Sequence, residues 1–358
     1  MKIRIAAIAI LFLSFAGASH AAKVAIDELN GSDLGMGIGA RAIGMGGAFT
    51  ALADDASAMF WNPAGLTLLN RSETMLMIDQ DPIRYTFKSI VFRPEEWRKK
   101  KSSPAIGIAQ INRLKYIGQG DWAGDTYAQH LVDLSMIAVD FSNPTWQNTN
   151  GGINSRTVDH RISAALTLPS EENTSIGINY VDFECVTTFY GAWDGRACQV
   201  VAYDAIDLGI LYRAGGRMRF GAMLKNPFEK TKPRYLVLGS AFFKDKDTTY
   251  TLDIERIFGN YSSHLRKARF LILRAGMERS ISPQWKFRAG LILPMQASTS
   301  TLGNIRKNLP SPKFGGAIGF GYSSGDTSID AAIYGDPGRS YVEHKIKVNY
   351  TLTVSQKF

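Results

Sequence analysis

The C-terminal stretch of the chain alternates between apolar and polar residues, and no other feature of the sequence constrains the fold as strongly. Successive side chains of a β-strand point to opposite faces, so the alternation predicts a strand with one apolar and one polar face. The apolar face carries Ile346, Val348, Tyr350, Leu352, Val354 and Phe358, with Gln356 as its single polar member; the other carries Lys345, Lys347, Asn349, Thr351, Thr353, Ser355 and Lys357. This pattern fits the closing strand of a membrane β-barrel or, alternatively, the last strand of a soluble sandwich.

Composition is compatible with a barrel. Charged residues make up 20 % of the chain and the mean hydropathy is −0.09, as expected when each strand is only half apolar. Glycine (34) and the aromatic residues (19 Phe, 14 Tyr, 6 Trp) are plentiful, and barrels use them at strand bends and at the two membrane interfaces. No run after the N-terminal segment approaches the 18 apolar residues of a transmembrane helix.

The N-terminal residues 1–21 resemble a secretory signal peptide. Lys2 and Arg4 precede an apolar run over 5–15, and Ser19-His20-Ala21 fits a small-x-small cleavage site. Removal of this segment takes the formal net charge from +9 to +7, because it contains two basic residues. Export argues against nucleic acid as the partner of the basic chain, and it favours the bacterial outer membrane as the location, with membrane lipid around the barrel.

Strand-like runs can be counted backwards from the C-terminus, and there are roughly fourteen. They lie near 341–358, 327–334, 314–322, 284–292, 268–280, 248–257, 234–243, 217–224, 199–213, 174–188, 159–168, 131–141, 105–116 and 85–93. Short and long connections alternate between them, as in outer-membrane barrels, except that Gly118–His130 is long where a short turn is expected. The run Glu73–Ile78 is not included in this count, and it is either a first strand or part of the segment that precedes the barrel. We therefore expect an all-β, transmembrane antiparallel β-barrel over residues 73–358.

Residues 22–72 precede the barrel and are rich in small side chains. The part from Gly39 to Leu66 reads GARAIGMGGAFTALADDASAMFWNPAGL and contains few strand formers. Small residues permit close backbone approach, so this segment is expected to fold inside the barrel as a hatch. The candidate hatch residues are Gly39, Arg41, Gly44, Gly46, Gly47, Asp54, Asp55, Asn62, Pro63 and Gly65. The part around Gly44–Gly47 is expected to move.

This 28-residue motif resembles the N-terminal signature of the PorV/PorQ family, which is grouped with FadL-type outer-membrane proteins. The resemblance implies a 14-stranded barrel with an N-terminal hatch in its lumen. FadL-type proteins take up hydrophobic compounds, and PorV-like proteins serve the type IX secretion system at the cell surface. The form Phe60-Trp61-Asn62-Pro63-Ala64-Gly65-Leu66 is nearer to the PorV/PorQ pattern, and the chain is shorter than typical FadL chains.

Alternation also selects residues that share the inward-facing parity of their strands. The candidate lumen residues are Arg217, Arg219, Arg274, Glu278, Lys286 and Arg288. They either line a polar path or pair with one another in a water-filled lumen. Cys185 and Cys198, the two cysteines, flank a connection expected outside the cell and are possible disulfide partners; two free thiols are the alternative.

Enzymatic function and cofactors are not indicated. Gly35–Ala40 matches G-x-G-x-x-A, but a dinucleotide site needs a strand before this motif, and the preceding residues 23–34 hold only a brief apolar stretch at Val24–Ile26. The histidines show no metal-ligand spacing, and no G-x-S-x-G motif is present. Two functions remain: passive transport of hydrophobic small molecules, and an interaction role with secretion-system components. In either case the barrel assembly machinery is an expected partner, because Tyr350, Leu352, Val354 and Phe358 form a candidate C-terminal insertion signal.

Overall fold

The structure is a computed structural model that describes residues 37–80, 83–118, 152–190, 196–228, 234–259, 265–301, 306–308, 314–335 and 348–358. The expected signal peptide, 1–21, and the beginning of segment 22–72 lie outside these residues. In the described part of the chain, no helix has both the length and the apolar character needed to cross a membrane.

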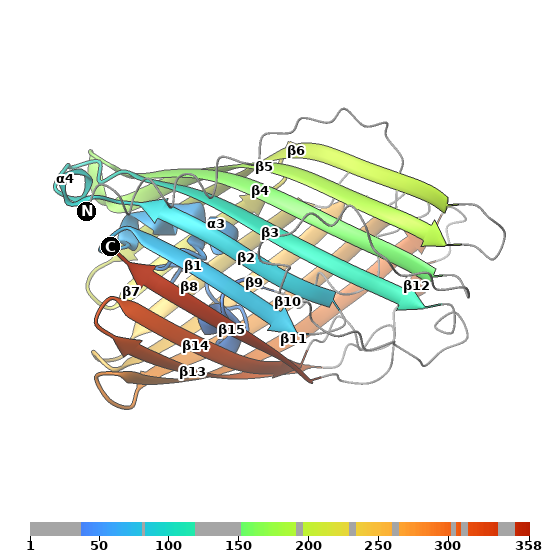
Figure 1. Cartoon of the computed structure of the whole chain (residues 1–358). Coiled ribbons are helices and arrows are strands. Elements are labelled where there is room, and N and C mark those ends of the chain that lie inside the picture. The colour runs from blue at the N-terminus through green and yellow to red at the C-terminus, as the bar shows by residue number, and fades with distance from the viewer. Residues whose placement is uncertain are drawn as a thin grey trace.

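Fourteen strands form a closed antiparallel barrel, which confirms the predicted fold class (Figure 1). Neighbours in sequence are neighbours in the wall, and β1 pairs with β15 to close it. The wall strands are β1 (Glu73–Gln80), β2 (Ile83–Phe92), β3 (Ala105–Gly118), β4 (Gly152–Leu168), β5 (Glu171–Tyr190), β6 (Arg196–Ala214), β7 (Met218–Lys225), β8 (Arg234–Phe243), β9 (Thr248–Gly259), β10 (Leu265–Ser280), β11 (Trp285–Thr301), β13 (Gly315–Ser324), β14 (Thr327–Gly335) and β15 (Val348–Lys357). The short β12 (Arg306–Asn308) pairs with residues 298–300 of β11.

The identity of the first wall strand corrects the strand count made from the sequence. The leftover run Glu73–Ile78 is β1, which pairs with β15 on one side and β2 on the other. The run 131–141, predicted as a strand, lies outside the described residues, and β3 pairs directly with β4. β3 therefore connects to β4 at the end of the barrel away from Phe358, where a long connection is expected. The exceptions to the expected rhythm become the connection from β1 to β2, which has only two residues, and the longer connection from β2 to β3.

We call the end of the barrel where β1 begins and β15 ends the Phe358 rim. Five of its connections are short, namely residues 169–170, 215–217, 244–247, 281–284 and 325–326. The connection between β2 and β3 is longer and contains the single-turn helix α4 (Glu95–Arg98). At this rim the Phe358 amide donates to the Ser72 carbonyl at 3.0 Å, and the rings of Phe358 and Phe92 meet edge to face.

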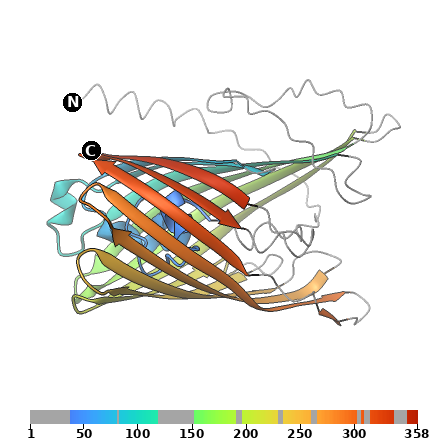
Figure 2. The ribbon, with the colours of Figure 1, turned by 90° about the horizontal axis from the view of Figure 1, so that it is seen from below.

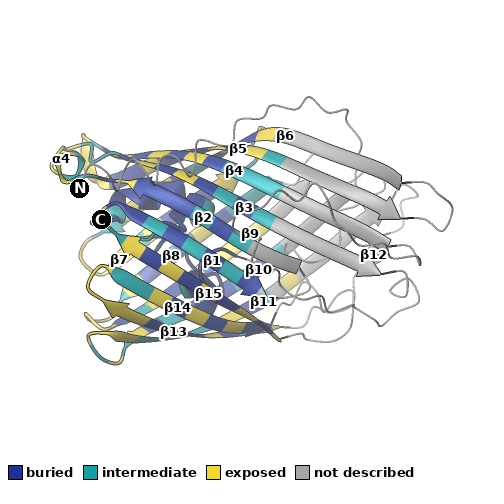
Figure 3. Cartoon of the chain, in the orientation of Figure 1, coloured by how far each residue is buried: buried dark blue, intermediate teal, exposed yellow. Residues whose placement is uncertain are grey.

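The outer surface of the barrel is apolar, as the C-terminal alternation predicts. Val348, Tyr350, Leu352, Val354 and Phe358 are all exposed, whereas the intervening Asn349, Thr351, Thr353 and Ser355 are buried. Figure 3 shows this alternation of buried and exposed positions along β13, β14 and β15. A ring of exposed isoleucine, leucine, phenylalanine and tyrosine side chains around a closed wall is the surface expected of a protein whose solvent is lipid.

The hatch, residues 37–72 of the described chain, lies inside the barrel next to the Phe358 rim (Figure 2). It contains two short helices, α2 (Ala40–Gly44) and α3 (Ala58–Trp61), and the 3₁₀ helix η2 (Pro63–Leu68). Its apolar side chains form the core of the molecule together with inward-facing residues of the first strands. This core includes Ile38, Met45, Phe49, Leu52, Met59, Trp61 and Leu66 of the hatch, and Met77, Phe87 and Val91 of the wall.

Candidate functional site

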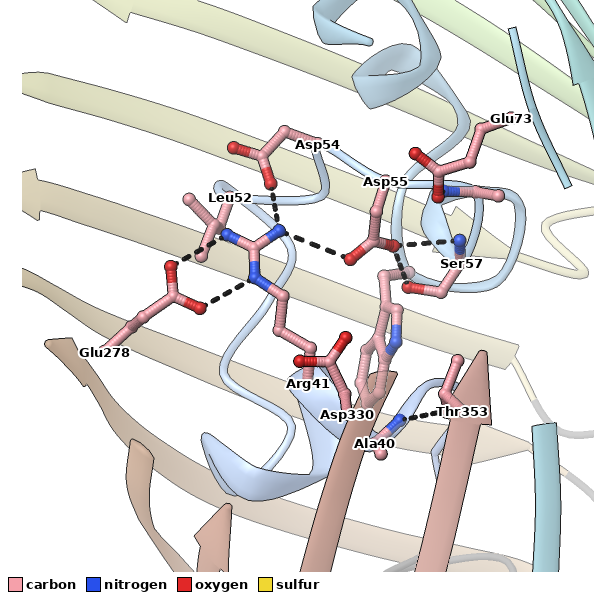
Figure 4. A network of polar contacts seen from close by, with 12 residues as sticks. Ala40, Arg41, Leu52, Asp54, Asp55, Ser57, Glu73, Glu278, Asp330 and Thr353 are labelled. Carbon is pink, nitrogen blue, oxygen red and sulfur yellow. Dashed lines mark hydrogen bonds and ion pairs between the residues drawn. The ribbon is translucent and has the colours of Figure 1, made fainter. Parts of the chain in front are cut away.

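Arg41 is the centre of the polar contacts between the hatch and the wall (Figure 4). Its Nε and Nη2 donate to the two carboxylate oxygens of Glu278 at 2.8 and 3.1 Å. Its Nη1 donates to Asp54 at 2.6 Å and to Asp55 at 3.3 Å. Burial alone would lower the pKa of Arg41, but Asp54 and Glu278 outweigh it and hold that pKa well above its ordinary value. One guanidinium thus joins the two acidic residues of the hatch to the barrel, as its planar donor set permits.

Glu278 extends this network along the wall. It accepts from Arg288 Nε at 2.7 Å and from Lys286 Nζ at 3.4 Å, and Arg288 in turn donates Nη1 to Asp330 at 2.7 Å. Because the side chain of Arg288 is only 2 % exposed, its charge depends on these two carboxylates for compensation. The candidate lumen residues on β10 and β11 therefore pair with one another and with the hatch. Where the hatch meets these strands, they do not line an open polar path.

Asp54 and Asp55 occupy different surroundings, although they are adjacent in sequence. Asp54 also lies 3.5 Å from Arg219 Nη1, on β7. Asp55 accepts from the amide and hydroxyl of Ser57, which orders the turn before α3. Burial raises the pKa of the Asp55 carboxyl, and Arg41 only partly offsets this effect. Arg219 and Arg41 therefore bind Asp54 from two sides, while Asp55 is more strongly desolvated.

Asn62 and Pro63 fix the end of α3 and the start of η2. The residue before a proline avoids the helical region, and Asn62 is extended at φ −169°. Its amide nitrogen donates to the carbonyls of Thr50 and of Ile210 on β6, both at 3.0 Å, and its oxygen accepts from the Ala64 amide. The side chain therefore caps η2 and connects the hatch to the wall.

Two further wall residues hold the hatch: Asp253, which the sequence did not single out, and the candidate lumen residue Arg274. One carboxylate oxygen of Asp253, on β9, accepts from the amides of Phe49 and Thr50 at 3.0 and 2.9 Å. Arg274 donates to Glu255 through Nε and Nη2, and its Nη1 lies 3.3 Å from the Gly46 carbonyl. A hatch backbone without regular structure leaves such amides and carbonyls unpaired, and charged wall residues satisfy them.

Glycines of the wall make room for the hatch. Eight described, inward-facing positions carry a glycine at which a Cβ would contact hatch atoms: Gly107, Gly177, Gly209, Gly221, Gly239, Gly276, Gly290 and Gly319. Six of them form cross-strand pairs, 177 with 209, 221 with 239, and 276 with 290. A Cβ on Gly290 would overlap the main-chain nitrogen of Gly46. We call these eight residues the glycine belt; interior strand glycines that permit close backbone approach are a signal the sequence did contain.

The side of the hatch away from the Phe358 rim carries an aromatic and basic group. Phe60 is half-buried, with the Arg161 guanidinium 5.3 Å and the Lys225 Nζ 3.7 Å from its ring centroid. Arg161 also binds Asp159 and Asp207 at 2.7 and 3.1 Å. Cations lie favourably over an aromatic face, so Phe60 is held in place where the hatch borders the rest of the lumen.

The remaining candidate residues are placed as follows. Arg217 lies in the exposed turn before β7, outside the Arg41 network that contains Arg219, Glu278, Lys286 and Arg288 and apart from the pair of Arg274 and Glu255. Gly39, Gly46 and Gly47 have positive φ values of 87°, 67° and 74°, whereas Gly44 and Gly65 are required by close packing against Gly319 and Ala53.

The strand register places the two cysteines apart. Cys185 pairs with Val201, and Cys198 pairs with Thr188. Their positions are therefore offset by three residues, which is roughly 10 Å along a strand. A disulfide needs Cα atoms about 4.4–6.8 Å apart, so of the two alternatives for these cysteines this register fits two free thiols better than a disulfide.

These features define the class of the protein as a 14-stranded membrane barrel whose lumen holds an N-terminal hatch. Solved structures of FadL-type transporters share the fold. The toluene transporter TodX of Pseudomonas putida has a TM-score of 0.63 at 13 % identity, with 91 % of this chain and 99 % of that chain covered. The toluene transporter TbuX of Ralstonia pickettii gives 0.59 at 14 %, covering 91 % and 99 %.

A FadL homologue of Pseudomonas aeruginosa gives a TM-score of 0.54 at 11 % identity, covering 86 % of this chain and 95 % of that chain. No protein-family model and no curated protein sequence matches the chain. At such low identities the likeness establishes the fold, which resembles that of bacterial outer-membrane transporters.

Proposed function

We propose that this protein resides in the outer membrane and passes hydrophobic small molecules through it passively. The observation that carries the proposal is the hatch held across the lumen of a 14-stranded barrel, in the fold of the toluene transporters TodX and TbuX. Outer-membrane barrels with an open, polar lumen serve as water-filled channels. A lumen occupied by a hatch with an apolar core suits a selective path better than a general aqueous pore.

In this proposal the solute enters from the side opposite the Phe358 rim and reaches the hatch near Phe60. It leaves when a small part of the hatch shifts. We favour the segment Gly44–Gly47 as that part, because Gly46 and Gly47 tolerate backbone conformations that other residues resist. The Arg274 contact to the Gly46 carbonyl, at 3.3 Å, is the longest of the three bonds that Arg274 makes to Glu255 and Gly46, so the segment could be released locally while Arg41 keeps the rest of the hatch seated.

Uptake of radiolabelled toluene by cells that display the protein tests this proposal. We expect faster uptake than in cells without it, and no glucose-driven swelling of liposomes that contain the purified barrel. Phe60→Ala should reduce toluene uptake, whereas Ile329→Ala, at an exposed site on the outer face, should not. A hydrophobic transport role would be refuted if cells with correctly inserted protein took up toluene no faster than cells without it, or if the liposomes swelled in glucose.

A second candidate function is that of a PorV-like accessory of a type IX-type secretion system. It is favoured by the resemblance of residues 39–66 to the PorV/PorQ signature, which here builds the seated hatch. In that role the partners would bind at the barrel surface. Loss of specific surface proteins in a deletion strain, together with normal toluene uptake, would favour this function over transport.

A further inference from the structure

A second group of cations lies at the Phe358 rim, separate from the Arg41 network. Its members are Arg93, directly after β2, Arg98 in α4, and Arg213 near the end of β6. Arg93 and Arg213 continue the inward-facing series of their strands, because Val91 and Leu211 are both fully buried. Arg93 and Arg213 therefore lie on the lumen side of the wall, at the mouth of the barrel, and Arg98 of α4 is near enough for its charge to act on Arg93.

The segment that carries Arg93 and Arg98 is anchored to the wall. The Thr167 amide of β4 donates to the Ser102 carbonyl at 2.7 Å. On the other side of the β4–β5 hairpin, Arg213 donates through Nη2 to the Glu172 carbonyl. The rim end of the β4–β5 hairpin is thus contacted on its β4 side by the segment that carries Arg93 and Arg98, and on its β5 side by Arg213.

Arg93 is the most constrained of the three. It is 7 % exposed, its amide donates to the Ser72 hydroxyl at 2.9 Å, and its Nη2 donates to the Ser103 hydroxyl at 2.6 Å. Ser103 adopts a φ of 35°, a left-handed conformation that is unfavourable for a serine. The backbone is therefore held in a costly conformation at the residue whose hydroxyl fixes Arg93.

The three guanidinium groups lack an anionic partner within the described chain. The Nε atoms of Arg93, Arg98 and Arg213 are buried without a hydrogen-bond acceptor, and no described carboxylate lies within ion-pair distance of the three side chains. The nearby Glu95 binds Lys99 at 2.7 Å instead. Burial, together with the charges of Arg98 and Arg213, lowers the pKa of Arg93 to about 10. Like charges brought together in this way are unfavourable unless an anion compensates them.

We propose that Arg93, Arg98 and Arg213 form a binding site for an oxyanion, either a phosphate or a carboxylate group, at the mouth of the barrel. Guanidinium groups match such oxygens in geometry and bind them through charge-assisted hydrogen bonds. The oxyanion is a free inorganic ion or the head of an anionic amphiphile, since both present the same charged oxygens to the guanidinium groups. The site lies on the Phe358 side of the hatch and does not depend on the transport proposed above.

Trp97 provides a reporter, because it directly precedes Arg98 in α4 and is half-buried. The fluorescence of the purified barrel is titrated at constant ionic strength with inorganic phosphate, octanoate and octanol, with Trp97→Phe as the blank. We expect a saturable change with phosphate or octanoate, and none with octanol. Arg213→Gln should weaken binding at least about tenfold. Arg71→Gln is the matched control, since Arg71 lies at the same rim in an exposed pair with Asp326.

Phosphate binding identifies a free oxyanion, and octanoate binding without phosphate binding identifies an amphiphile head; both support the site. Absence of a saturable change with either anion, or equal weakening in Arg71→Gln, would overturn it. A thermal melt separates binding from a structural role. Without anion, Arg213→Gln should melt no lower than wild type, because it removes like-charge repulsion, and only wild type should gain stability from the bound anion.

Discussion

Replacement of Arg41 by methionine should loosen the hatch while leaving the barrel intact. The change removes the four hydrogen bonds to Glu278, Asp54 and Asp55, and it leaves a partly buried group of carboxylates with fewer cations. Breaking a buried ion pair typically costs about 3–5 kcal/mol. We expect a value near the lower limit, roughly 3 kcal/mol, because Glu278 retains Arg288 and Lys286.

Hydrogen exchange followed by mass spectrometry measures this effect by region. A loss of about 3 kcal/mol corresponds to roughly 150-fold faster exchange of hatch amides that exchange through hatch opening. Peptides from residues 37–72 should show this change, whereas wall peptides should not. The hatch exchange rate of Arg41→Lys should lie between those of wild type and Arg41→Met, since lysine keeps the charge without the bidentate geometry.

The control for Arg41 is Arg71→Gln, which removes an exposed pair worth about 0–1 kcal/mol and should leave hatch exchange unchanged. Two results would refute the reasoning: unchanged exchange of the hatch in Arg41→Met, or an equal loss of protection in the hatch and in the wall strands. The first would mean that apolar packing alone seats the hatch, and the second that hatch and wall unfold as one unit.

Three further predictions follow from the contacts of the hatch and the register of the wall. Gly290→Ala should displace the hatch and increase its cleavage by added protease, whereas Gly216→Ala, which meets open space, should not; equal cleavage would contradict the glycine belt. Asp55→Asn should slow hatch exchange or leave it unchanged at pH 7.5. Burial raises the pKa of Asp55 in the folded state, so the charged carboxylate destabilises the hatch at pH values above that pKa, and this destabilisation is lost as the pH falls. The difference in hatch exchange between Asp55→Asn and wild type should therefore shrink in acid. A difference that widens in acid would refute the prediction. Alkylation without reductant should label both Cys185 and Cys198, and an intact mass that lacks the two labels would show that the strand register is wrong there.

The barrel could be predicted from the sequence because its signal is local. Alternation at period two is set by the pleat of each strand, so Tyr350, Leu352 and Val354 already identify the face that contacts lipid. The error at the first strand has a physical cause as well. Glu73–Ile78 directly follows the hatch, and only its pairing with β15, nearly 280 residues later in the chain, distinguishes a wall strand from a part of the hatch.

The hatch contacts were less predictable, because they join residues that are distant in sequence. The motif indicated that Arg41, Asp54 and Asp55 belong to one segment, but nothing local indicated that Glu278 would be their partner. Inward parity selected Glu278 and Arg288 correctly as lumen-facing residues, yet the same argument included Arg217, which lies beyond the strand where parity no longer applies. The glycine belt was visible in the sequence, but the glycines were attributed to bends.

The wide distribution of the hatch contacts has a consequence for the order of folding. The Ala40 amide binds the Thr353 hydroxyl of β15, Glu73 of β1 accepts from Ala56, and the glycine belt adds contacts from β3 to β13. These groups surround the hatch only after the first and last strands have met. Contacts of such long sequence separation form slowly, so hatch seating should be the final, rate-limiting step of maturation. Protection of the amides of residues 37–72 from hydrogen exchange would then show that a barrel has closed correctly.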